Sequence, residues 1–126
     1  MATVLLIDDD ADLIDINRVV LTARDFTVRA ALSASEARKA LQEHQPDLVV
    51  LDIMMETPTI GIDLAREIHQ GNPKLPILML SGIRKAMDLP FKFDADETWL
   101  PVAQFLEKPF SPATLADKVQ TILNGA

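Results

Sequence analysis

The chain has 126 residues, of which 48% are hydrophobic and 25% charged, a composition typical of one ordinary globular domain and not of a disordered or collagen-like chain. Twelve Lys and Arg residues against nineteen Asp and Glu give a formal net charge of −7, and because nucleic-acid binding requires Lys and Arg to neutralise phosphates, we expect no direct contact with nucleic acid. The absence of cysteine excludes disulfides and thiolate chemistry. No apolar run has membrane-spanning length and the start lacks the basic residues of a signal peptide, so we predict a cytoplasmic protein with no membrane partner.

Apolar runs of strand length alternate along the chain with segments of helical spacing. The runs Val4–Ile7, Leu48–Leu51 and Ile77–Leu80 are apolar at every position, a pattern typical of strands that are covered on both faces, as in parallel sheets. Several of them end abruptly in polar residues, as Val4–Ile7 does in three aspartates. The predicted strands are Val4–Ile7, Phe26–Ala30, Leu48–Leu51, Ile77–Leu80 and a fifth strand that ends at Lys108.

Four segments show apolar residues at the three- to four-residue spacing of a helix face. Asp10 or Asp12 is the expected N-cap of the first helix, Ser33 or Ser35 that of the second, and Ser111 that of the last. The apolar positions are Leu13, Ile16, Val20 and Leu21 in the first helix, Ala37, Ala40 and Leu41 in the second, Ile62, Leu64, Ala65 and Ile68 in the third, and Leu115, Val119, Ile122 and Leu123 in the last.

The segment from Arg84 to Val102 interrupts this alternation. It contains Pro90 and Pro101 together with aromatic and acidic residues, which do not suit one regular helix. We therefore predict an irregular or shortened fourth helix. The order of the other elements predicts one α/β domain over residues 1–126, built on a doubly wound parallel sheet.

Carboxylates gather where two of the predicted strands end. Asp8 and Asp9 follow the first strand, and Asp52 follows the third. Ligands of open parallel sheets bind at the carboxyl ends of the strands, so these side chains converge if the two strands are neighbours. Several negative charges at such short range repel one another unless a cation joins them. Oxygen ligands with open positions suit Mg²⁺, which we expect as the cofactor.

A hydroxyl and an amine follow the remaining strands. Ser81 ends the fourth strand and Lys108 the fifth. Together with the aspartates they form a set suited to phosphoryl transfer onto a carboxylate: one Asp attacks, the metal and Lys108 neutralise charge, and Ser81 hydrogen-bonds the product.

The ordered set resembles the receiver domain of two-component response regulators over essentially the whole chain. Four motifs carry the resemblance: Ile7-Asp8-Asp9, Leu51-Asp52-Ile53-Met54-Met55, Ser81-Gly82 and Lys108-Pro109-Phe110. The family implies a flavodoxin-like five-stranded parallel sheet with strand order 2-1-3-4-5.

The same resemblance implies the roles of individual residues. Asp52 would be the phosphoacceptor, Ser81 and Lys108 would contact the phosphoryl group, and Ser81 and Phe105 would form the conformational switch. Asp8, Asp9, Asp52 and the backbone carbonyl of Met54 would hold Mg²⁺. The implied donor is a sensor histidine kinase or phosphotransfer protein, and the implied recipient is a downstream output protein or domain. Such a protein catalyses only its own phosphorylation and dephosphorylation.

Two alternative functions stay open. A receiver-like adaptor would bind partners without phosphorylation. A small Mg²⁺-dependent phosphatase with an aspartyl-phosphate intermediate would use the Asp-x-Asp pattern of Asp8 and Asp10, but such enzymes need acidic metal ligands after the lysine, where Pro109 stands here. A calcium-binding EF-hand is excluded because Leu13 occupies the position that requires glycine and Val19 the position of the bidentate glutamate.

Overall fold

The computed structural model describes residues 2–52, 58–82, 104–108 and 110–125, and the side chains at 58–60, 62, 81–82, 104–105, 107–108 and 125 lie outside that description. The strands are β1 (Thr3–Ile7), β2 (Thr27–Ala31), β3 (Leu48–Asp52), β4 (Ile77–Gly82) and β5 (Gln104–Lys108). The helices are α1 (Ala11–Ala23), α2 (Ala34–Glu43), α3 (Pro58–Gly71) and α5 (Pro112–Gly125).

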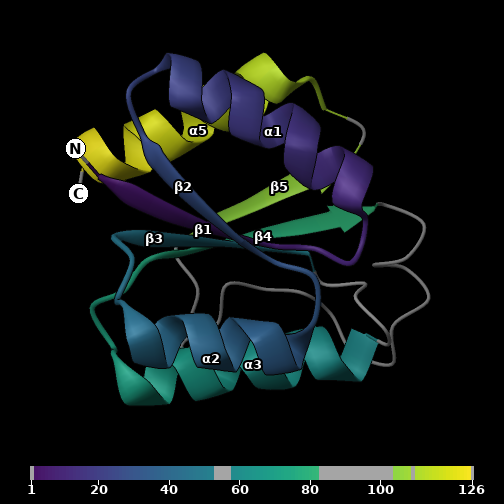
Figure 1. Ribbon diagram of the computed structural model, residues 1–126, viewed down its shortest axis with the longest axis vertical. Coiled ribbons are helices and arrows are strands. Elements are labelled where there is room, and N and C mark those ends of the chain that lie inside the picture. The colour runs from purple at the N-terminus through teal and green to yellow at the C-terminus, as the bar shows by residue number, and fades with distance from the viewer. Residues whose placement is uncertain (1, 53–57, 83–103, 109, 126) are drawn as a thin grey trace.

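The five strands form one parallel sheet in the order β2-β1-β3-β4-β5. Figure 1 shows α1 and α5 on one face of this sheet and α2 and α3 on the other. The doubly wound fold and its strand order are therefore confirmed. The predicted irregular fourth helix, at 84–102, lies outside the described residues.

The core consists of two apolar layers, one on each face of the sheet. Successive side chains of a strand point to opposite faces, so Val4 and Leu6 belong to the layer under α1 and α5, whereas Leu5 and Ile7 belong to the layer under α2 and α3. All four are buried. This two-sided burial explains why the strand is apolar at every position.

The buried face of α1 differs from the predicted one. Ile14, Asn17 and Leu21 are buried, whereas Ile16 is 48% exposed, so its predicted place on the apolar face is wrong. The apolar residues of α1 extend around more of the helix than its buried face, so residue spacing alone was compatible with two overlapping buried faces. In the structure the buried face is the one that includes Asn17.

The other helices are placed as their patterns predict. Ala34, Ala37 and Ala40 are the buried residues of α2, and Leu115 and Val119 are buried on α5. The predicted N-caps Ser33 and Ser111 are confirmed. The Ser33 hydroxyl accepts a hydrogen bond from the backbone N–H of Glu36 at 3.1 Å, and the Ser111 hydroxyl accepts one from the backbone N–H of Thr114 at 3.1 Å. Within the described ranges, none of the helices has both the length and the apolar character needed to cross a bilayer.

Candidate functional site

Three carboxylates meet at the carboxyl edge of the sheet. Asp8 and Asp9 follow β1, and Asp52 is the last residue of β3, the strand that pairs with β1. One carboxylate oxygen from each of Asp8, Asp9 and Asp52 lies within 4.8 Å of the others. Asp8 and Asp52 are each only 4% exposed, whereas Asp9 is exposed to solvent. The cluster is therefore a partly buried, oxygen-only group that opens on one side.

Backbone hydrogen bonds hold the start of this acidic segment in place. The Asp8 N–H donates to the Ala31 carbonyl at 3.1 Å, which carries the pairing of β1 and β2 past the last strand residue. The Asp10 N–H then donates to Oδ1 of Asp8 at 3.0 Å. This contact between a side chain and the amide two residues later is the usual turn formed by Asp or Asn.

Asp10 is also the N-cap of α1. Its carboxylate accepts from the N–H of Asp12 at 3.0 Å and from that of Leu13 at 3.3 Å, so the predicted capping role falls on Asp10, and Asp12 lies in the first turn. The positive end of the α1 dipole therefore lies next to the acidic cluster, where it favours negative charge. Sequence reasoning missed the bond from the Asp10 amide to Asp8, although three consecutive aspartates after a strand are a signal for such a turn.

The positions predicted to contact phosphate lie on the same edge of the sheet as the carboxylates. Asp52 is in register with Leu80 on β4, and the next two β4 residues, Ser81 and Gly82, pair with Glu107 and Lys108 of β5. Ser81 and Lys108 thus occupy strand ends, as predicted, while their side chains lie outside the described residues.

Two further predicted site positions are less fully described. Phe105 pairs with Met79 within the sheet, and its side chain lies outside the description. Met54, the predicted backbone ligand, belongs to the segment 53–57, which also lies outside it. Both histidines lie outside the acidic cluster. His44 is exposed at the end of α2, and His69 is half-buried in the last turn of α3.

A doubly wound sheet with clustered aspartates at its carboxyl edge defines a class of α/β domain whose site suits a divalent cation. The sequence model of the response regulator receiver domain matches residues 4–120. The chain belongs to this family and is a receiver domain of two-component systems.

Curated relatives support this family assignment. The alkaline phosphatase synthesis transcriptional regulatory protein PhoP of Bacillus subtilis is 30% identical over 123 residues, which cover 95% of this chain and 48% of the relative. The DNA-binding response regulator MtrA of Mycobacterium tuberculosis is 31% identical over 122 residues, which cover 95% of this chain and 50% of the relative. The chain thus spans about half the length of the curated relatives it matches.

Solved structures agree with the fold. The receiver domain of NtrX from Brucella abortus superposes with a TM-score of 0.80 at 28% identity, covering 98% of this chain and 99% of that one. The names of the relatives give no support to the prediction that this chain makes no direct contact with nucleic acid, since several are called DNA-binding or transcriptional regulators.

Proposed function

We propose that this receiver is a phosphoacceptor, with Asp52 as the residue that takes the phosphoryl group from a phosphohistidine of a sensor histidine kinase or phosphotransfer protein. The observation that carries the proposal is the position of Asp52. Asp52 is 4% exposed at the end of the central strand β3, and one of its carboxylate oxygens lies within 4.8 Å of oxygens of Asp8 and Asp9. A nucleophile in this place is largely shielded from bulk water, and the neighbouring Asp9 is exposed to solvent.

The carboxylate cluster fits a hard divalent cation. Three carboxylate groups offer oxygen atoms at mutual distances that one ion can bridge, and they come without nitrogen or sulfur ligands. In the proposal, Asp8, Asp9, Asp52 and the backbone carbonyl of Met54 hold Mg²⁺. When bound, the ion supplies neutralisation of negative charge on phosphoryl oxygens.

The proposed transfer is a single displacement at phosphorus. A carboxylate oxygen of Asp52 forms a bond to phosphorus while the phosphorus–nitrogen bond of the donor phosphohistidine breaks. The electron pair of that bond returns to the imidazole nitrogen, which takes up a proton. The product is an aspartyl phosphate and a free histidine.

The strand ends next to Asp52 supply the remaining proposed contacts. Lys108 neutralises charge on the phosphoryl oxygens, and Ser81 donates a hydrogen bond to them. Movement of Ser81 toward the new phosphate, coupled to Phe105, alters a face that binds a downstream output protein or domain. The proposal includes a single receiver unit over 1–126, a cytoplasmic location, and catalysis limited to the protein's own phosphorylation and dephosphorylation.

The test is incubation with Mg²⁺ and a small acyl phosphate, followed by intact-mass measurement. We expect the wild-type chain to gain one phosphoryl group, Asp52→Ala to gain none, and Asp9→Asn to be labelled more slowly. Asp15→Ala is the matched control, because Asp15 is an exposed acid on α1 outside the cluster, and it should be labelled like the wild type.

Two other results would replace the proposal. No labelling of the wild-type chain would favour the adaptor that acts without phosphorylation. Repeated turnover of a phosphate ester by the purified protein would favour the phosphatase.

A further inference from the structure

Asp10 directly follows two aspartates of the acidic cluster, yet its own side chain is bonded elsewhere. The cluster consists of three carboxylates whose oxygens lie within 4.8 Å of one another, and Asp10 is not among them. Its Oδ1 instead accepts hydrogen bonds from the backbone N–H of Asp12 at 3.0 Å and from that of Leu13 at 3.3 Å. The third aspartate of the run is therefore bonded to α1 and withheld from the cluster.

The backbone of Asp10 connects the same turn of α1 to the cluster. Its carbonyl accepts from the N–H of Ile14 at 3.1 Å, which is the first hydrogen bond of the helix. Ile14 is 4% exposed and belongs to the apolar layer under α1 and α5. The N–H of Asp10 donates to Oδ1 of Asp8 at 3.0 Å. One residue thus joins a carboxylate of the cluster to a helical turn that is anchored in the core.

These contacts give the Asp8 side chain a defined orientation. A hydrogen bond to a charged oxygen is stronger than one to a neutral oxygen, so the bond from the Asp10 N–H favours one arrangement of the Asp8 carboxylate. The N–H is aimed at Asp8 while residue 10 keeps the extended conformation of an N-cap, with φ −97° and ψ 102°. The bonds from the Asp10 side chain to α1 hold this conformation, because they form only when the first turn of the helix is closed.

We propose that Asp10 is a positioning residue that couples the first turn of α1 to the cation site, so that loss of the cap weakens cation binding and cation binding stabilises the cap. This coupling rests on the proposed function, which identifies the site. Coupling free energy between two sites is reciprocal, so the two effects occur together. Asp10 acts through its oxygen acceptor and not through its charge, which distinguishes it from a fourth carboxylate ligand.

A purely electrostatic role for Asp10 predicts a different pattern. The charge of Asp10 attracts a cation at a distance, and any neutral substitution removes that attraction. Asparagine keeps a side-chain oxygen that can accept from the helix N–H groups, whereas alanine has no acceptor. Asp10→Asn and Asp10→Ala therefore share the loss of charge and differ in the cap.

The experiment is an NMR titration of the ¹⁵N-labelled chain with Mg²⁺. Asp10→Ala should bind Mg²⁺ about tenfold more weakly than Asp10→Asn, the lower end of the effects known for groups that orient metal ligands. Ser33→Ala is the matched control, because it removes the N-cap acceptor of α2, whose bond to the Glu36 N–H is 3.1 Å long and lies outside the cluster. It should bind Mg²⁺ like the wild-type chain.

Amide hydrogen exchange, measured before and after the titration, tests the reverse direction without any phosphoryl transfer. Before Mg²⁺ is added, the amide of residue 10 should exchange about tenfold faster in Asp10→Ala than in Asp10→Asn, because its bond to Asp8 is lost. Saturation with Mg²⁺ should slow the amides of Asp12 and Leu13 by at least about fivefold in the wild-type chain and in Asp10→Asn, but not in Asp10→Ala. The Glu36 amide at the cap of α2 reports any slowing that is common to the whole chain.

Equal Mg²⁺ affinity of Asp10→Asn and Asp10→Ala would overturn the proposal, as would a response of Asp12 and Leu13 no larger than that of Glu36. Asp10→Gly replaces Asp10→Ala if the latter does not fold, because glycine also lacks the acceptor and is tolerated better at N-caps. Absence of Mg²⁺ binding by the wild-type chain would overturn the coupling. Absence of labelling by an acyl phosphate while Mg²⁺ is bound would overturn the proposed function alone.

Discussion

The two faces of the sheet are covered in different ways. On one face, α1 and α5 bring large side chains such as Leu21, Leu115 and Val119, and the two helices contact each other more extensively than α2 and α3 do. On the other face, α2 contributes only alanines as its buried residues. Small residues cover the sheet but do not reach sideways to the neighbouring helix, so a cavity is left between α2 and α3.

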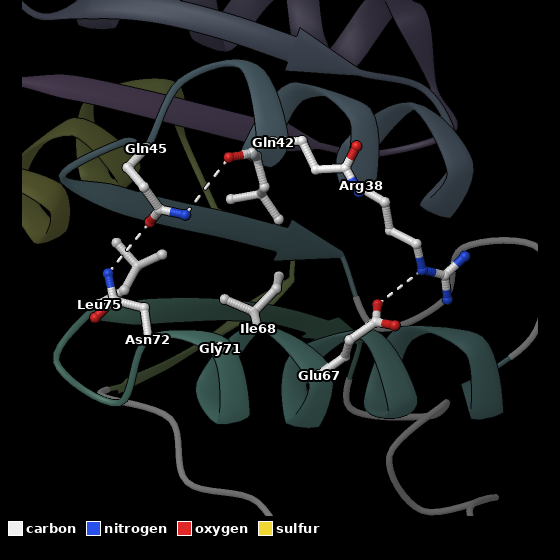
Figure 2. Close-up of a pocket in the computed structure, with 9 residues that line it drawn as sticks. Arg38, Gln42, Gln45, Glu67, Ile68, Gly71, Asn72 and Leu75 are labelled. Carbon is white, nitrogen blue, oxygen red and sulfur yellow. Dashed lines mark hydrogen bonds and ion pairs between the residues drawn. The ribbon is translucent and has the colours of Figure 1, made fainter.

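The two faces of one sheet can therefore differ in how tightly their helices pack against each other. Large side chains fill the space between α1 and α5, whereas α2 and α3 cover the sheet but leave a cavity between them (Figure 2). Both faces share the same strands, whose carboxyl ends carry the aspartates. The predictions below compare matched changes on the two faces.

The largest expected difference is in the cost of cavity formation. Leu21→Ala on α1 removes a fully buried side chain and should lower the free energy of unfolding by about 3–4 kcal/mol. Ile68→Ala on α3 borders an existing cavity that solvent reaches, so it should cost less, about 2 kcal/mol. Urea unfolding measures both values. An equal or larger loss for Ile68→Ala would show that the second face is as tightly packed as the first.

A second comparison concerns the N-caps, Asp10 for α1 and Ser33 for α2. Asp10→Ala and Ser33→Ala should each lower stability by about 1 kcal/mol, because each leaves helix N–H groups without an acceptor. Only Asp10→Ala should also weaken Mg²⁺ binding, because loss of the cap loosens the turn in which the backbone N–H of residue 10 donates to Asp8 Oδ1.

Calorimetric titration with Mg²⁺ separates the lost cap from the lost charge. Asp10→Asn removes the charge and keeps the cap, so it should bind Mg²⁺ more tightly than Asp10→Ala does. Equal Mg²⁺ affinity of these two variants would mean that the cap does not position Asp8.

The smallest expected effects come from the ion pairs that link the helices on each face. Arg24 pairs with Asp117 between α1 and α5, and Arg38 pairs with Glu67 between α2 and α3. Asp117→Asn and Glu67→Gln should each change stability by less than about 1 kcal/mol, because at least one partner in each pair is exposed and solvent screens the charges. Thermal unfolding at low and high salt checks this. A larger, salt-independent loss for Glu67→Gln would mean that this pair holds the α2–α3 spacing.

The sequence predicted β1, β3 and β4 well because these strands are buried on both faces of the sheet and therefore read as continuous apolar runs. The edge strand β2 is only partly buried and contains Thr27 and Arg29, so its apolar pattern is weaker. The sequence also predicted that Asp8, Asp9 and Asp52 converge, since these residues follow strands that a parallel sheet brings together. Ile16 was misplaced because α1 has two overlapping apolar stripes and residue spacing does not choose between them. The α2–α3 cavity could not be predicted, because its width depends on how two helices pack over the sheet.

The acidic cluster also links occupancy of the site to the stability of the chain. In the unfolded chain Asp52 is remote from Asp8 and Asp9, so folding itself brings the like charges together. A cation that binds only this folded arrangement, and not the unfolded chain, stabilises the fold by its binding free energy. The free energy of unfolding therefore rises with the fraction of molecules whose acidic cluster holds a cation.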